Sequence, residues 1–273
     1  MAGGISSMPA QTARDSAPLG LLGGGDLNDE QLLRYSRQIM LPGLGRDGQQ
    51  QLIDATVLIV GLGGLGSPTA MYLAAAGVGR LLLADFDAVD LSNLQRQLLH
   101  SNADIGRTKV DSAIDTLRAL NPDIRLEPVK ASLNTERLAR LTKRVDLVVD
   151  CCDNFATRFA VNAACVAQRI PLVSGAAIRG EGQVCVFSGQ PGEPCYQCLF
   201  PSQGEQEDTC EQSGVLAPLV GIVGSIQATE AIKILTGLGQ PLFGRLLLLD
   251  AWNMEWREVR LSNDPACKIC GGR

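Results

Sequence analysis

The sequence is poor in histidine, and this limits the acid–base chemistry that an active site in it can use. Only His100 is present among 273 residues. Enzymes that rely on a catalytic histidine, as many dehydrogenases do, therefore have a single candidate residue. A lone histidine is more often structural than catalytic, so we expect His100 to have a structural or surface role.

The chain also lacks an excess of positive charge and a secretory leader. It carries 24 Lys and Arg against 29 Asp and Glu, a net charge of −5, which argues against a nucleic-acid-binding surface. Residues 1–25 hold two charges and no apolar segment before a cleavage site. We expect residues 1–26 to be a disordered tail, residues 27–273 to form one domain, and the protein to be cytoplasmic.

No apolar run is free of polar residues over the length that a membrane span needs. The longest, residues 215–235, contains Pro218, Gln227, Glu230 and Lys233, and this predicts a buried helix and no membrane association. Nine cysteines are an odd number and are unevenly placed. Without a secretory leader they favour metal binding or redox chemistry over a disulfide framework.

Apolar strands alternate with helices through the first two thirds of the chain, which predicts an α/β fold with a Rossmann-like, doubly wound, mainly parallel sheet. A helix is expected to start at Asn28 and to end before the glycines at 43 and 45. The expected strands are 56–60, 80–85, 125–129, 145–150 and 171–174, and the expected helices are 67–76, 109–119, 135–142 and 154–168. Strands at 183–187 and 245–250, with a helix at 220–235 between them, are expected to extend the same sheet.

The stretch VLIVGLGGLG, residues 57–66, is an apolar strand that ends in G-x-G-x-x-G before an alanine-rich helix. Such a turn lets backbone N–H groups and a helix N-terminus approach phosphate. Asp85 follows Gly61 by 24 residues, at the end of the second strand, where a carboxylate holds ribose hydroxyls. These features leave NAD, FAD, S-adenosylmethionine and ATP open.

Polar residues after the second strand favour a triphosphate. DLSNLQRQ at 90–97 and GRTK at 106–109 supply Asn93, Arg96 and Lys109, and two cations suit a phosphate chain whose charge must be neutralised during attack on phosphorus. Asp150, Asp153 and Asn154 close the fourth strand, where an aspartate can hold Mg²⁺ beside phosphates. The alternative role for Asp153 or Asn154 is to cap the next helix.

Two C-x-x-C pairs match a structural metal site. Cys195 with Cys198 and Cys267 with Cys270 are separated by 68 residues, and four thiolates match tetrahedral zinc with no open coordination position. The alternative is a pair of redox dithiols. The cysteines in strand and helix patterns are expected to be buried as small apolar residues, and these are Cys151, Cys152, Cys165 and Cys185.

Motifs along the chain resemble one enzyme family. RYSRQ, GLGGLGSP, DLSNLQRQ, GRTK, CCDN, SGAAIRGEGQ, CYQC and CKIC occur in this order. Together they resemble the MoeB/ThiF family, the ubiquitin-activating-like adenylyltransferases of sulfur carriers, over residues 27–271. The resemblance implies ATP-dependent adenylation of the C-terminal glycine of a carrier ending in Gly-Gly, with release of pyrophosphate.

The same resemblance implies roles for individual residues. It places Gly63 on the phosphates and Asp85 on the ribose, and it implies phosphate contacts from Asn93, Arg96 and Lys109 and Mg²⁺ coordination by Asp153. Arg37 matches a family arginine that reaches into the ATP site of a second subunit, which implies a homodimer. The family also carries zinc on the two C-x-x-C pairs.

The pathway and the part played by Cys210 stay open. A MoaD-like carrier, for molybdenum cofactor biosynthesis, is the leading expectation, and a ThiS-like carrier for thiamine thiazole synthesis is the alternative. A catalytically silent Rossmann-type scaffold is a remote third. Cys210 resembles the position of a cysteine that ThiF-type enzymes link to the carrier, but its acidic neighbours disfavour the thiolate. The sulfur donor is expected to be a separate protein.

Overall fold

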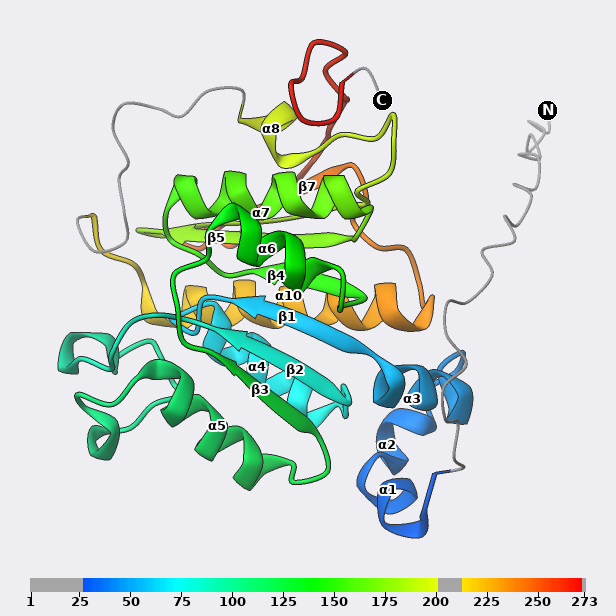
Figure 1. Ribbon diagram of the computed structural model, residues 1–273, viewed down its shortest axis with the longest axis vertical. Helices are drawn as coiled ribbons and strands as arrows, with labels where there is room; N and C mark the ends of the chain where they lie inside the picture. Colours follow the sequence, from blue (N-terminus) through cyan, green and yellow to red (C-terminus); the bar gives the residue numbers. More distant parts are fainter. Residues whose placement is uncertain (1–26, 201–212, 272–273) are drawn as a thin grey trace, which may run out of the picture.

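The computed structural model describes residues 27–200 and 213–271. Its centre is one eight-stranded sheet with the order β3-β2-β1-β4-β5-β6-β7-β8 (Figure 1). The first five of these strands are parallel, and β6, β7 and β8 are antiparallel to their neighbours. The prediction of a mainly parallel, doubly wound sheet with a C-terminal extension is confirmed.

Helices cover both faces of the parallel part, because its strands are apolar on both sides. The strands are β1 (Thr56–Val60), β2 (Arg80–Ala84), β3 (Arg125–Val129), β4 (Leu147–Asp150) and β5 (Leu172–Ile178). Val57 and Ile59 face a core shared with α4 (Gly66–Ala75), α5 (Lys109–Leu120) and α10 (Ala217–Thr236). Leu58 and Val60 face the other core, with α6 (Thr135–Thr142) and α7 (Phe155–Gln168).

The C-terminal part of the sheet is a meander of β6 (Glu181–Phe187), β7 (Arg245–Asp250) and β8 (Glu255–Arg260). Two of these strands were predicted, whereas β8 was not. All six of its residues are exposed, and it forms the free edge of the sheet. Because neither face of β8 enters a core, its sequence EWREVR lacks the apolar alternation by which a strand is recognised.

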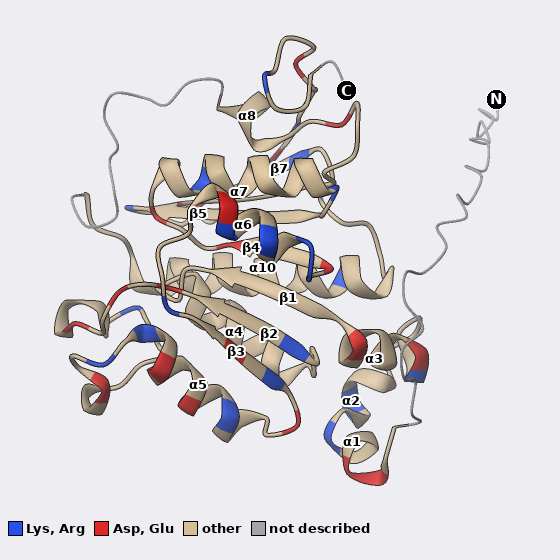
Figure 2. Ribbon diagram, in the orientation of Figure 1, with Lys and Arg blue, Asp and Glu red and all other residues tan. Residues whose placement is uncertain are grey.

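Helix α10 is, within the described ranges, the helix long and apolar enough to cross a membrane. It packs along α4 and the β5–β6 part of the sheet, and Figure 2 shows it almost free of charged residues. Leu219, Val223 and Ala231 are at most 1% exposed. Its apolar composition is therefore that of a helix lying over the centre of a sheet, as predicted.

The N-terminal region contains more helix than predicted. The expected helix is split into α1 (Asp29–Arg34) and α2 (Ser36–Ile39), and α3 (Gly45–Asp54) follows the Pro-Gly break. Asn28 caps α1 in a capping box with Gln31. These three helices lie where β1 begins, and Gln49 of α3 donates to the carbonyl of Ala76 at the end of α4 (Figure 1).

Candidate active site

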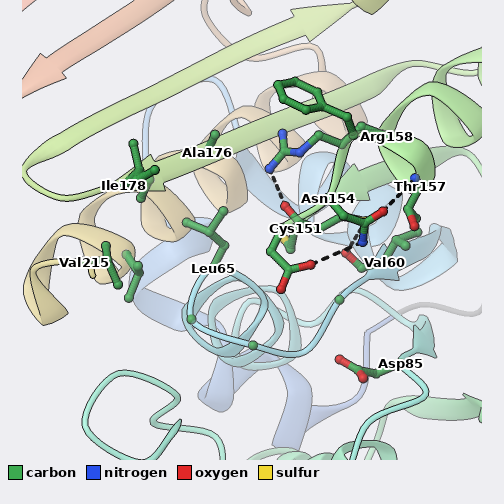
Figure 3. Close-up of a pocket in the computed structure, with 18 of the residues that line it drawn as sticks. Val60, Leu65, Asp85, Cys151, Asn154, Thr157, Arg158, Ala176, Ile178 and Val215 are labelled. Atoms are coloured by element: carbon green, nitrogen blue, oxygen red, sulfur yellow. Dashed lines mark hydrogen bonds between the residues drawn. The ribbon is translucent and has the colours of Figure 1, made fainter. Parts of the chain in front are cut away.

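A cavity of about 380 Å³ opens at the carboxyl ends of the parallel strands (Figure 3). In open α/β sheets this edge is where ligands bind. Each parallel strand contributes to the wall through residues at or just after its carboxyl end. These are Val60 and Gly61 at β1, Asp85 and Asp87 at β2, Ala131 to Leu133 at β3, Asp153 and Asn154 at β4, and Ala176 to Ile178 at β5.

The glycine turn at the floor of the cavity has no room for larger residues. Gly61 has a φ of 91°, and a Cβ there would lie 2.7 Å from the carbonyl oxygen of Cys151. A Cβ on Gly66, the first residue of α4, would lie 1.9 Å from the carbonyl oxygen of Gly61. The close approach of strand, turn and helix that exposes the backbone to a phosphate therefore depends on these glycines.

His100 holds this turn in place and is structural, as predicted. It is buried, with Nε2 3.0 Å from the carbonyl oxygen of Leu62 and Nδ1 2.8 Å from Oγ of Ser112. Since the carbonyl can only accept, Nε2 carries the proton and Nδ1 accepts from the Ser112 hydroxyl. Burial lowers the pKa of His100, and the ring is therefore neutral. Both of its nitrogens are engaged by these two hydrogen bonds.

Asp85 lies in the cavity wall with both carboxylate oxygens bonded to backbone. Oδ2 accepts from the N–H of Leu62 at 2.7 Å and Oδ1 accepts from the N–H of Asp87 at 2.8 Å. Burial raises the pKa of Asp85, and the positive charge of Lys109 opposes this shift. Each oxygen keeps a lone pair, which is what a ribose hydroxyl would need.

Two cations line the cavity beside this carboxylate. Lys109 is 6% exposed and its Nζ lies 2.8 Å from Oδ2 of Asp87. Arg96 donates from Nη1 to the carbonyl oxygen of Ser92 at 3.0 Å. Asn93 is buried, and its carbonyl accepts from the backbone N–H of Arg96, but its side chain is not part of the cavity wall.

Asp153 and Asn154 have separate roles in the structure. Oδ1 of Asn154 accepts from the N–H of Thr157 at 2.9 Å, so Asn154 is the N-cap of α7. Asp153 is exposed in the cavity wall, and its carboxylate accepts one bond, from Nδ2 of Asn154 at 3.3 Å. The capping alternative therefore applies to Asn154 and leaves Asp153 available to a ligand.

The sequence analysis missed Arg158, a buried cation in the cavity wall. It forms an ion pair with Asp150 (Nη1–Oδ2 3.5 Å) and donates from Nη2 to the carbonyl oxygens of Gly175, at 2.8 Å, and Cys152. Ser174 completes the group by donating to Asp150 at 2.8 Å. Arg158 lies one helical turn after the cap residue Asn154, and this spacing is the sequence signal that would have placed it at this edge of the sheet.

Arg37 does not line this cavity. Arg37 is exposed on α2, beside the start of β1, and the cavity lies beyond the other end of that strand (Figure 1). Cys210 lies outside the described residues. The structure therefore brings together Gly63, Asp85, Arg96, Lys109 and Asp153, with Asn93 behind them.

The four predicted metal ligands form one cluster, with all four sulfurs within 4.8 Å of one another. Sγ of Cys195 lies 3.8 Å from that of Cys267, and Sγ of Cys198 lies 3.3 Å from that of Cys270. Tetrahedral zinc with Zn–S bonds of about 2.3 Å places sulfurs roughly 3.8 Å apart. The backbone N–H of Asp264 and Nδ2 of Asn162 point at two of the sulfurs, at 3.4 and 3.6 Å. The residues fit zinc.

The remaining described cysteines are buried among apolar residues, as predicted, and these are Cys151, Cys152, Cys165 and Cys185. Burial raises the pKa of Cys151 to about 12 and raises those of the other three as well. Thiols of this kind are not reactive at neutral pH.

Comparison with known proteins places these features in a family. The model of the ThiF family matches residues 35–269. Molybdopterin-synthase adenylyltransferase of Escherichia coli (strain K12) is 54% identical over 246 residues, which are 90% of this chain and 99% of that relative. Sulfur carrier protein ThiS adenylyltransferase of the same organism is 48% identical over 246 residues, 90% of this chain and 98% of that relative.

A solved structure supports the fold. The crystal structure of E. coli MccB with MccA-N7isoASN aligns with a TM-score of 0.77 at 22% identity, over 87% of this chain and 75% of that chain. At this identity the likeness concerns the fold alone. With the family model covering most of the sequence, the chain belongs to the ThiF family.

Proposed function

We propose that this protein uses ATP to adenylate the C-terminal glycine of a ubiquitin-like sulfur carrier of the MoaD type, for molybdenum cofactor biosynthesis. A carboxylate oxygen of the carrier attacks the α-phosphorus and forms the new O–P bond. The bond between the α-phosphorus and the α,β-bridging oxygen breaks, and its electron pair leaves with pyrophosphate. No proton has to be transferred, because both the nucleophile and the leaving group are anions.

The observation that carries this proposal is the composition of the cavity wall. A glycine turn, three cations (Arg96, Lys109 and Arg158) and the carboxylate of Asp153 surround one space. The single histidine of the chain has both ring nitrogens engaged behind the turn. Such a wall can position and neutralise a phosphate chain, and it offers no histidine for hydride or acyl chemistry. The two relatives named above carry the corresponding activity in their names.

Each wall residue has a role in this reaction. Gly63 lies against the phosphates and Asp85 accepts from the ribose. Lys109 and Arg96 neutralise the phosphate charge that develops as pyrophosphate leaves, and Asn93 supports them from behind. Asp153 would hold Mg²⁺, which supplies further neutralisation between the phosphates when bound.

The four-sulfur cluster would hold structural zinc. All four ligands come from the chain, so a tetrahedral ion there has no open position and supplies a cross-link in place of catalysis. The cross-link ties the segment around Cys267 and Cys270 to Cys195 and Cys198, and this cluster packs against Val166 near the end of α7. The C-terminal segment is thereby fixed to the α/β body.

We place Arg37 in the ATP site of a second copy of the chain, which makes the working enzyme a homodimer. Arg37 cannot reach its own cavity, since the five residues of β1 alone span roughly 16 Å. Leu33 on α1 is 77% exposed, and Met40 and Leu41 at the end of α2 are 71% and 54% exposed. An apolar surface of this kind suits burial against a second copy.

The sulfur that the activated carrier receives would come from a separate protein. Of the eight described cysteines, four form the metal cluster and four are buried with raised pKa values. None of these eight can act as an exposed sulfur carrier. We place the reaction in the cytoplasm, where such thiols stay reduced.

The test is exchange of labelled pyrophosphate into ATP, with a MoaD-type and a ThiS-type carrier offered separately to zinc-loaded protein. Exchange with the MoaD-type carrier alone is the expected result. Exchange with the ThiS-type carrier alone would replace the proposed substrate with the alternative that the 48% identical relative suggests. Exchange with both would make the protein a shared activator. No exchange with either would leave a nucleotide-binding scaffold.

A further inference from the structure

Gln97 is a buried polar side chain in the wall of the nucleotide cavity. It is 4% exposed and directly follows Arg96 in the DLSNLQRQ segment. Both residues line the cavity. This segment therefore brings a neutral amide, as well as a cation, to the part of the wall where the phosphates of ATP are expected.

The backbone of Gln97 is fixed by the same turn that carries His100. The N–H of Gln97 donates to the carbonyl oxygen of Asn93 at 3.0 Å, and its own carbonyl oxygen accepts from the N–H of His100 at 3.1 Å. His100 in turn donates from Nε2 to the carbonyl oxygen of Leu62, which belongs to the glycine turn. The position of Gln97 is therefore tied to that of the glycine turn.

The side-chain amide of Gln97 lies against Gly63, the glycine to which we assign the phosphates. A Cβ on Gly63 would lie 3.4 Å from Nε2 and 3.8 Å from the amide carbon of Gln97. The Nε2 atom of a glutamine carries two N–H groups, and both can donate. A phosphate oxygen that contacts the backbone of Gly63 therefore comes next to these donors.

The amide oxygen of Gln97 has no partner in the described part of the chain. Oε1 is buried, and no donor of residues 27–200 and 213–271 forms a hydrogen bond with it. Burying a carbonyl oxygen without a donor destabilises a folded protein, and an apolar side chain of the same shape removes this penalty. Folding alone therefore favours an apolar residue at position 97, and the amide indicates a role toward a ligand.

We propose that Gln97 is a phosphate-binding residue, whose Nε2 donates to an oxygen of the phosphate that rests on Gly63. Phosphate oxygens are acceptors, so the amide presents its nitrogen to them. Arg96 and Lys109 neutralise the phosphate charge, whereas the neutral amide fixes the direction of the phosphate without adding charge. This inference rests on the proposed function, since it requires the triphosphate of ATP in the cavity.

Gln97→Met tests this role because methionine has a similar shape and lacks both polar amide atoms. The Kd of the zinc-loaded full chain for Mg·ATP, measured by calorimetry, should rise about tenfold or more, since a hydrogen bond to a charged group is lost. The Kd for adenosine, which has no phosphate, should stay within about twofold of wild type. The Tm without nucleotide should equal that of wild type or exceed it by up to about 4 °C, because an unpartnered buried oxygen is removed.

Gln95→Met is the matched control. Gln95 belongs to the same segment, but it is exposed and lies outside the cavity wall. The same substitution at this position should therefore leave both Kd values and the Tm unchanged.

Three results would contradict the phosphate contact in different ways. Unchanged Mg·ATP affinity in Gln97→Met would overturn it. Equal losses for adenosine and Mg·ATP, or a Tm lowered by more than about 4 °C, would also overturn it, because they indicate a structural role. Absence of Mg·ATP binding in the wild-type protein would overturn the proposed function and this inference together, whereas the other results leave the proposed function standing.

Discussion

Lys109 is the cation on which phosphate chemistry at this site depends most. Its ammonium group is buried beside carboxylates, and a water molecule in its place would not supply the positive charge. Its ammonium group pairs with Asp87 and faces Asp85. Lys109→Ala should lower the rate of carrier-dependent pyrophosphate exchange by about 100-fold or more, the usual effect of deleting a preorganised charge. Lys130→Ala is the control, since Lys130 pairs with Asp111 on the surface. Equal rates in Lys109→Ala and wild type would remove Lys109 from the site.

The sequence predicted which residues near the strand ends belong to the site, but it did not predict which other residues they contact. Gly63, Asp85, Arg96, Lys109 and Asp153 were all assigned and all line one cavity. Asp85 and Asp153 could be placed at this edge because a parallel sheet brings its strand ends together. The phosphate contacts of Gly63, Arg96 and Lys109 were implied by the resemblance of their motifs to the family. Arg158 was missed because its partners Asp150, Cys152 and Gly175 are brought to it only by the fold.

Asp104 gives the stability of the protein a dependence on acid pH. The hydroxyl of Ser101 donates to Asp104 at 2.7 Å and holds the pKa of that carboxyl at about 2, below the ordinary value of an aspartate. The ionised form therefore stabilises the folded state above about pH 4, and this contribution is lost as the pH falls toward 2. Asp104→Asn should lower the free energy of unfolding by about 1 kcal/mol at pH 7.

The measurement for Asp104 is denaturant unfolding of wild type and Asp104→Asn at several pH values between 7 and 2.5. The difference in free energy of unfolding should shrink as the pH falls below 4. A difference that stays constant with pH would mean that Asp104 acts only through the shape of its turn. Asp115→Asn, at an exposed carboxylate that pairs with the same Arg107, is the control and should show a smaller effect.

At the scale of whole elements, the sequence predicts those that bury a face and misses those that do not. The strand at 56–60 and the helix at 135–142 have the predicted bounds, and both bury apolar side chains. Helix α3 has the sequence GRDGQQQLID with one large apolar residue buried, Leu52. It is held by tertiary contacts, such as the bond from Gln49 to Ala76, which no local pattern reveals.

The segment that carries Cys195 and Cys198 depends on the metal cluster for its stability. Its helix, α8 (Tyr196–Leu199), has only four residues and no side-chain cap. Zinc analysis should return about one ion per chain, as a single four-thiolate site requires. Cys267→Ala should lose the ion and lower the Tm by roughly 10 °C, since 1 kcal/mol corresponds to about 2–4 °C in a chain of this size. We expect this loss to exceed its effect on pyrophosphate exchange.

The control for Cys267 is Cys165→Ala, which deletes a buried thiol outside the cluster. This variant should keep its zinc and lose only the packing of one sulfur atom. Full stability and activity of a metal-free wild-type protein would refute the zinc assignment, and with it the explanation of how the C-terminal segment is held.

At the scale of the whole molecule, one sheet separates two surfaces that the reaction needs together. The cavity lies at the carboxyl ends of the parallel strands, and Arg37 lies with α1, α2 and α3 where β1 begins (Figure 1). A single chain cannot close this gap by moving a side chain. Two copies related by a twofold axis can do so, since each can place its α2 against the cavity of the other and form two identical sites.

Mixing two inactive variants tests this arrangement. Arg37→Ala should fold normally and lose pyrophosphate exchange, because Arg37 is exposed and stabilises no core. Asp153→Ala should also lose exchange, through its own cavity. In a mixed dimer one cavity combines an intact Asp153 with an intact Arg37 from the partner, so random assortment restores activity at roughly a quarter of the wild-type sites. Co-expression of the two variants with different affinity tags provides the mixed dimer for assay. If each site were instead completed within one chain, the mixture would stay as inactive as its parts.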